Sequence, residues 1–257
     1  MPGLSRRLGL PARPDPHGRA PDYPFFLPGS GPDREDACLL VHGSTGTAGD
    51  MRFLGEFLNA RGFAVEGVSL PGHRRRPSEL RGVGWEACYA VVREAWLGLA
   101  AQYRRVHVVG FSFGGSLALH LAAREPVEDL VLLAPALLVH LSVRALLLTV
   151  LGLFPGTPAH SRVRWNLGLV RFFRLVANDV ERVDCSLLAV HARDDATVRL
   201  DSSLAIFDRV ASRDRRLRVL ARGGHLLPHG EAREEVWEEV ERHLAARRAV
   251  GARGRAS

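Results

Sequence analysis

The sequence predicts a single α/β domain in which helices cover both faces of a mostly parallel sheet. The chain has 257 residues, a length that one α/β domain commonly reaches. With 46% hydrophobic and 25% charged residues, it can bury a full core. Short apolar runs alternate with segments of helical period, which is the pattern of parallel strands joined by crossover helices.

The first half of the chain alternates strand, helix, strand and helix. Continuous apolar runs predict strands at Ala37–Val41 and Phe63–Ser69, and the second of these ends at Pro71-Gly72. Apolar residues at helical spacing predict helices over Asp50–Arg61 and Trp85–Tyr103.

The second half continues this alternation. A strand at Val106–Gly110 turns at once into a helix over Phe113–Arg124, and a strand at Leu130–Ala134 is stopped by Pro135. The remaining predicted elements are strands at Leu187–Ala192 and Leu217–Leu220 and helices at Leu200–Ala211 and Glu231–Arg247.

Three segments depart from this rhythm. Residues 1–36 are rich in proline, glycine and charge, and predict a loose arm that settles onto the domain near Tyr23–Leu27. Residues 136–182 are longer than an ordinary crossover and predict a lid or cap. The predicted organisation is an arm (1–36), a core (37–135 with 183–247), a lid insertion (136–182) and a frayed tail (248–257).

The composition argues against several classes of function. The formal charge is +7, but the arginines are scattered and no nucleic-acid-binding motif is present. We therefore expect no nucleic-acid partner. The three cysteines, Cys38, Cys88 and Cys185, are odd in number and far apart, which argues against disulfides and zinc and favours a reducing compartment.

No apolar stretch of signal-peptide length precedes Pro11, so a cytoplasmic protein is expected. The segment Ala136–Phe154 is nearly long enough to span a membrane, but His140 and Arg144 interrupt it. A buried or lid helix is the better interpretation, and no transmembrane segment is expected. The sequence leaves the oligomeric state open.

The first motif that indicates a catalytic site is Gly110-Phe111-Ser112-Phe113-Gly114. This motif stands between a strand and a helix, and such a sharp turn exposes a serine hydroxyl at the carboxyl edge of the sheet. The alternative is a glycine-rich turn that binds a phosphate or nothing. Ser112 is the predicted nucleophile.

Serine needs a base and the base needs an orienting carboxylate. His225 follows the last predicted strand and is the predicted base, with His229 as the nearest rival. Asp194 and Asp195 both follow the strand 187–192, and either could be the acid. The developing oxyanion needs two N–H donors, for which we expect the backbone of Phe113 and of Ser44.

These residues resemble the α/β-hydrolase superfamily, and within it the compact bacterial carboxylesterases and monoacylglycerol lipases. The likeness spans about Leu39–Ala246. It implies the α/β-hydrolase fold and selects Asp195 over Asp194, because such proteins carry an apolar residue three positions after the acid, as Val198 stands here. The motifs that carry it are Leu40-Val41-His42-Gly43-Ser44-Thr45-Gly46, Leu70-Pro71-Gly72-His73, Gly110-Phe111-Ser112-Phe113-Gly114-Gly115, Arg193-Asp194-Asp195-Ala196-Thr197-Val198 and Gly224-His225.

The sequence departs from that pattern at two places. Ser44 stands where such esterases commonly have an aromatic residue, so the Ser44 hydroxyl could add a hydrogen bond to the oxyanion. The arginines 74–76 follow His73 where glycine is usual. They are either a solvated run or a cluster that favours anionic substrates.

The predicted function is hydrolysis of a small-molecule carboxylic ester through an acyl-enzyme, with no metal or organic cofactor. Apolar residues of the predicted lid, Phe172 and Phe173 among them, suggest an apolar acyl group of short to medium length or a monoacylglycerol. The alternatives are a thioesterase or acyltransferase on the same triad, C–C bond cleavage or perhydrolysis, and a non-catalytic binding protein.

Overall fold

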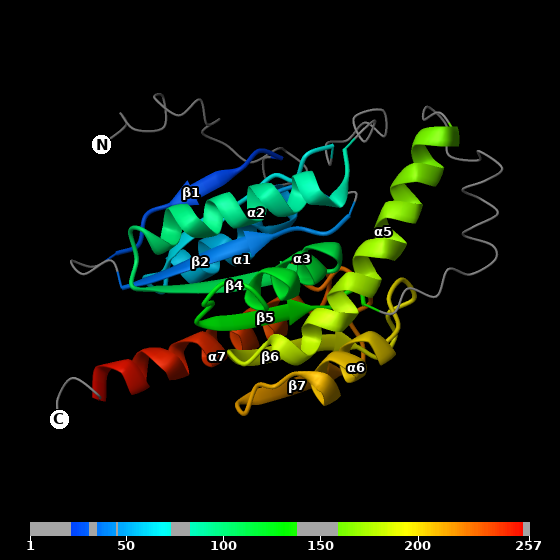
Figure 1. Ribbon diagram of the computed structural model, residues 1–257. Coiled ribbons are helices and arrows are strands. Elements are labelled where there is room, and N and C mark those ends of the chain that lie inside the picture. Colours follow the sequence, from blue (N-terminus) through cyan, green and yellow to red (C-terminus); the bar gives the residue numbers. More distant parts are fainter. Residues whose placement is uncertain (1–21, 31–34, 45, 73–82, 138–158, 254–257) are drawn as a thin grey trace.

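The structure of the chain is a computed structural model that describes residues 22–30, 35–44, 46–72, 83–137 and 159–253 (Figure 1). Its centre is a seven-stranded sheet in the order β1-β3-β2-β4-β5-β6-β7. The strand β1 pairs antiparallel with β3, and every other pairing in the sheet is parallel. The strands are β1 (Phe25–Leu27), β2 (Asp36–Val41), β3 (Ala64–Gly67), β4 (Arg105–Phe111), β5 (Asp129–Leu133), β6 (Ser186–Ala192) and β7 (Arg215–Leu220).

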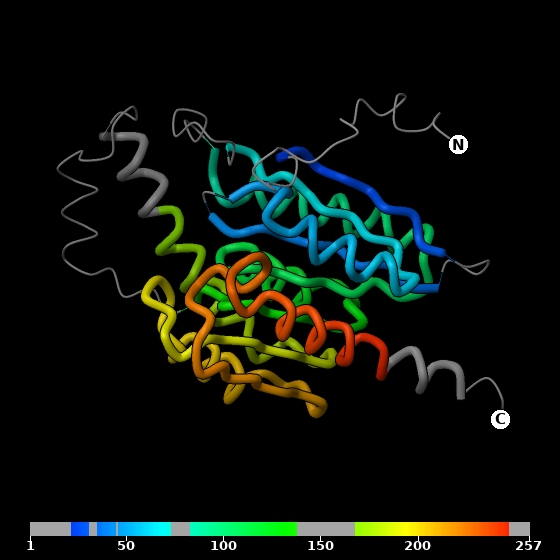
Figure 2. Tube along the Cα trace, turned by 180° about the vertical axis from the view of Figure 1, so that it is seen from behind, coloured from blue at the N-terminus to red at the C-terminus, as the bar shows by residue number. Residues whose placement is uncertain are grey.

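Helices cover both faces of this sheet, as the sequence predicts. One face carries α2, α3, α5 and α6 (Figure 1), and the other carries α1 and α7 (Figure 2). The fully buried strands β2, β4, β5 and β6 explain why their sequences are continuous apolar runs rather than alternating ones. The helices are α1 (Gly49–Asn59), α2 (Trp85–Ala100), α3 (Phe113–Ala122), α5 (Ala159–Asp179), α6 (Asp201–Arg209) and α7 (Arg233–Arg253).

Regular secondary structure extends into both terminal segments, which the sequence predicted to be loose or frayed. The strand β1 lies inside the predicted arm, where the arm was expected to meet the domain, and Phe25 is buried against α1 and β3. The helix α7 continues beyond Arg247 to Arg253, into the predicted frayed tail. Alanine and arginine are good helix formers, so this tail extends the helix readily.

Much of the predicted lid, 138–158, lies outside the described residues, as do the arginines 74–76. The described part of the lid region is α5 and a short 3-10 turn, Val180–Arg182. The lid assignment therefore stays a prediction. Among the described residues, no helix has both the length and the apolar character needed to cross a membrane.

A buried charged network joins the amino ends of three adjacent strands. Arg105 donates two hydrogen bonds to Asp36, at 2.6 and 2.9 Å. The His107 ring lies 3.2 Å from Asp36 and 2.7 Å from Asp129 and is fully buried. Burial alone would lower the pKa of His107, but its bonds to the two carboxylates raise it. The network ties β2, β4 and β5 together at the end of the sheet opposite to Ser112.

Candidate active site

The turn between β4 and α3 holds Ser112 in a backbone conformation that serine rarely adopts. Its φ of 53° and ψ of −117° lie outside the regions that are favourable for residues with a side chain. The Ser112 N–H donates to Leu133 O at 2.9 Å, and the Ser112 carbonyl accepts from the Gly115 N–H at 3.0 Å and the Ala136 N–H at 3.2 Å. Bonds to two neighbouring segments therefore hold the strained residue in place.

Glycines let α3 approach the strands closely at this turn. A Cβ on Gly110 would lie 2.5 Å from Gly114 O, and a Cβ on Gly114 would overlap the carbonyls of Val41 and His42. The backbone of α3 thus packs directly against the end of β2. This close approach brings the first turn of α3 beside the loop that follows β2.

The structure brings His225 to Ser112. His225 lies in the loop between β7 and α7, and its Nε2 is 3.0 Å from Ser112 Oγ. Its Nδ1 is 2.7 Å from Asp195 Oδ2. Because a carboxylate can only accept, Nδ1 carries the proton and Nε2 faces the serine hydroxyl as an acceptor. This is the tautomer that a general base for Ser112 requires.

The two candidate aspartates have different surroundings. Asp195 is buried, and its Oδ1 accepts hydrogen bonds from the N–H groups of Thr197 at 2.8 Å and Val198 at 2.9 Å. Asp194 is exposed and accepts a bond from the Gly224 N–H at 2.9 Å. Asp195 therefore contacts the His225 ring, whereas Asp194 accepts from the backbone beside it.

Hydrogen bonds keep Asp195 charged although it is buried. Burial alone would raise the pKa of the Asp195 carboxyl, but bonds from His191, His225, Val198 and Thr197 outweigh it and hold the pKa below its usual range. A persistent anion beside Nδ1 favours the imidazolium that forms when His225 accepts a proton.

The two predicted oxyanion donors belong to two segments next to Ser112, the start of α3 and the loop after β2. Phe113 is the first residue of α3 and directly follows Ser112. Ser44 follows Gly43 in the loop after β2, and a Cβ on Gly43 would lie 3.2 Å from Ser112 Cβ. The loop therefore lies against the serine.

His42 fixes this loop, a role that sequence reasoning missed. Its Nε2 accepts a bond from the Leu70 N–H at 3.0 Å, so its Nδ1 carries the proton and donates to Gly43 O at 2.8 Å. The ring thereby joins the loop after β2 to the segment after β3. Its place between a buried strand and a glycine was the only signal in the sequence.

Aromatic side chains pack around Phe113, the residue that follows Ser112. Phe172 of α5 is fully buried, stacks on Trp85 at 4.7 Å between ring centroids, and lies 5.7 Å from Phe113. Phe172 therefore packs in the core between Trp85 and Phe113. The end of α5 is fixed to α3 because His120 Nδ1 lies 2.6 Å from Asp179 Oδ2.

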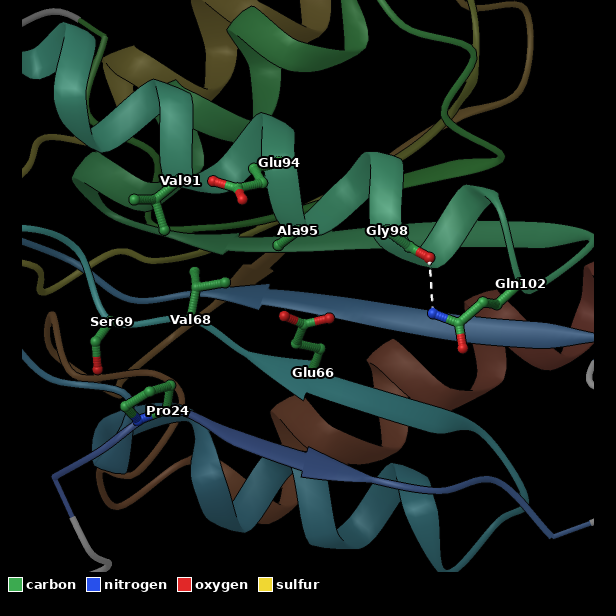
Figure 3. Close-up of a pocket in the computed structure, with 9 residues that line it drawn as sticks. All are labelled: Pro24, Glu66, Val68, Ser69, Val91, Glu94, Ala95, Gly98 and Gln102. Carbon is green, nitrogen blue, oxygen red and sulfur yellow. Dashed lines mark hydrogen bonds between the residues drawn. The ribbon is translucent and has the colours of Figure 1, made fainter. Parts of the chain in front are cut away.

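A separate groove of about 440 Å³ lies between β3 and α2, and no triad residue lines it (Figure 3). Glu66 lies on its floor and Glu94 on its α2 side. Burial raises the pKa of the Glu66 carboxyl. The folded chain thus holds this proton more tightly than the unfolded chain, and the ionised carboxylate costs stability.

Replacing Glu66 with glutamine should stabilise the protein at pH 7. Because the folded-state pKa is raised, the stability of the wild type is highest below the unfolded pKa and falls as pH rises through the folded one. The gain should be less than about 1 kcal/mol, since water still reaches the carboxylate, and it should vanish at acidic pH. Urea unfolding at several pH values measures it. The exposed Glu94→Gln is the control, and a loss of stability in Glu66→Gln at pH 7 would contradict the prediction.

The chain is similar in sequence to a family of known hydrolases and to individual bacterial enzymes. The alpha/beta hydrolase family model matches residues 38–239. A carboxylesterase of Bacillus subtilis (strain 168) is 25% identical over 243 residues, which are 84% of this chain and 94% of that protein. A thermostable monoacylglycerol lipase of Bacillus sp. (strain H-257) is 35% identical over 88 residues, 34% of this chain and 35% of that protein.

A solved structure shows the same fold. It comes from work on the metagenome-derived lipolytic enzymes LipS and LipT, and it superimposes with a TM-score of 0.75 at 22% identity. The match covers 89% of this chain and 98% of that one.

Proposed function

Because the chain belongs to the alpha/beta hydrolase family, we propose that it is a serine hydrolase that cleaves carboxylic esters through an acyl-enzyme on Ser112. One observation carries the proposal: the hydrogen bonds run without a break from Asp195 Oδ2 through the His225 ring to Ser112 Oγ. The names of the carboxylesterase and the monoacylglycerol lipase support the same reaction class.

In the first half of the reaction, Ser112 Oγ attacks the ester carbonyl carbon while its proton passes to His225 Nε2. Asp195 stabilises the imidazolium that results. The N–H groups of Phe113 and Ser44 bind the oxyanion. The tetrahedral intermediate collapses when His225 gives the proton to the leaving alkoxide, which departs as the alcohol.

In the second half, water attacks the acyl carbonyl and His225 takes one of its protons. The second tetrahedral intermediate collapses with the proton returning to Ser112 Oγ, so that the carboxylic acid leaves and the enzyme is restored. These groups complete the chemistry, and no step needs a metal or an organic cofactor.

For the substrate, we propose a small ester with an apolar acyl group of short to medium length, or a monoacylglycerol. The second candidate function is that of a thioesterase or an acyltransferase on the same triad. A thioesterase differs from an esterase in the leaving group, and an acyltransferase differs in the acceptor that takes the place of water.

Treating the wild-type protein with a fluorophosphonate tests the proposal. We expect a covalent adduct on Ser112 alone, located by peptide mapping. Ser116 lies one turn further along α3 and is the internal control, since its hydroxyl donates to the carbonyl of Ala136 rather than to a histidine. An intact fold without an adduct, or an adduct on Ser116, would overturn the proposal. Ester and thioester panels of increasing acyl length then identify the substrate class.

A further inference from the structure

A second histidine contacts the carboxylate that orients His225. His191 lies near the end of β6 and is fully buried. Its Nε2 is 2.9 Å from Val198 O and 3.4 Å from Asp195 Oδ2, and its Nδ1 is 2.7 Å from Ser203 Oγ. The His191 ring therefore lies between Asp195, the turn that follows Asp195, and α6.

The partners of His191 define its protonation. Val198 O and the Asp195 carboxylate can only accept, so the Nε2 carries the proton and shares it between them as a three-centre bond. Nδ1 is then the acceptor for the hydroxyl of Ser203, which is itself fully buried. The imidazole is thus held from both sides and cannot turn without breaking buried hydrogen bonds.

The bonds of His191 reinforce the geometry of the acid. Asp195 Oδ2 accepts from His225, and the same oxygen faces His191. Val198 donates its N–H to Asp195 Oδ1 and gives its carbonyl to His191. The His191 ring therefore holds Val198, whose N–H donates to Asp195 Oδ1. The Nε2 of the same ring also faces Asp195 Oδ2 directly.

We propose that His191, oriented by Ser203, is a positioning residue that fixes the Asp195 carboxylate plane so that Oδ2 points at His225. This inference rests on the proposed function only for its effect on turnover, because the positioning itself is a property of the folded chain.

Other buried histidines do not share this arrangement. His107 bonds to Asp36 and Asp129, and His243 lies 3.4 Å from Ser186 Oγ. Both sets of partners lie at the amino ends of strands, away from the triad. If His191 had a purely structural role, its replacement should resemble that of His243, for which we expect lower stability and unchanged turnover.

Replacing His191 with leucine tests the proposal. Loss of a hydrogen bond to the carboxylate that orients His225 should lower kcat by about 10- to 100-fold, with KM nearly unchanged. His191→Gln keeps a side-chain N–H near the position of Nε2 and should recover most of kcat. Ser203→Ala frees the ring and should lower kcat by about threefold to tenfold. His243→Gln is the matched buried-histidine control.

A proton NMR signal separates this inference from the proposed function. The His225 Nδ1–H bonded to Asp195 should give a downfield resonance in the wild type, weakened or shifted in His191→Leu and preserved in His191→Gln. If the wild type neither hydrolyses esters nor reacts with a fluorophosphonate, the proposed function fails while this resonance still tests the positioning. An unchanged resonance in His191→Leu, or in Ser203→Ala if the leucine variant does not fold, overturns the inference.

Discussion

Replacing Ser112 with alanine should lower kcat/KM for an ester substrate by on the order of a million-fold. The change removes the oxygen that forms the acyl-enzyme, and neither His225 nor the oxyanion donors can replace it. Stability should change little, because alanine needs no more room than serine. Steady-state hydrolysis of an activated ester, with circular dichroism to verify the fold, measures the effect.

His225→Ala should cause a loss of similar size, and the double variant Ser112→Ala/His225→Ala should lose no more than either single one. The two side chains act as one unit, so their effects are not additive. The control is Ser116→Ala, which removes a buried hydroxyl from the same helix and should reduce stability but not turnover. Substantial activity in Ser112→Ala, or additive losses in the double variant, would mean that hydrolysis takes place elsewhere.

The central part of the fold could be predicted because its signals are strong and local. Buried parallel strands such as β4 and β6 are short apolar runs, and glycine or proline marks where several of them end. The strand β1 has only three residues and pairs antiparallel at the edge, so it carries no period that a sequence could display. The predicted end of α7 at Arg247 was too early, because alanine and arginine favour the helix, which continues to Arg253.

The triad residues could be proposed from the sequence because each follows a predicted strand at the same edge of the sheet. Asp194 and Asp195 were not separable by position alone, since both follow β6. The separation depends on the turn at Thr197 and Val198, which buries one carboxylate and leaves the other exposed. His191 was overlooked because a lone histidine in an apolar strand resembles any buried histidine until its three-dimensional partners are known.

Because Asp195 contacts His225 and Asp194 does not, the same substitution should have very different effects at the two positions. Asp195→Asn should lower kcat by about ten-thousand-fold, with KM little changed. The asparagine oxygen can still accept from the N–H groups of Thr197 and Val198, which turns its NH₂ group toward His225. The ring then accepts at Nδ1 and carries its proton on Nε2, where it can no longer take the proton of Ser112.

Asp194→Asn is the matched control, because the two residues are adjacent and the chemical change is the same. The asparagine oxygen can accept the bond from the Gly224 N–H that the carboxylate accepts now, so turnover should stay close to that of the wild type. Comparable losses in both variants would show that the negative charge of the loop matters more than the tautomer of His225. A large loss in Asp194→Asn alone would make Asp194 the acid and require the loop to rearrange during the reaction.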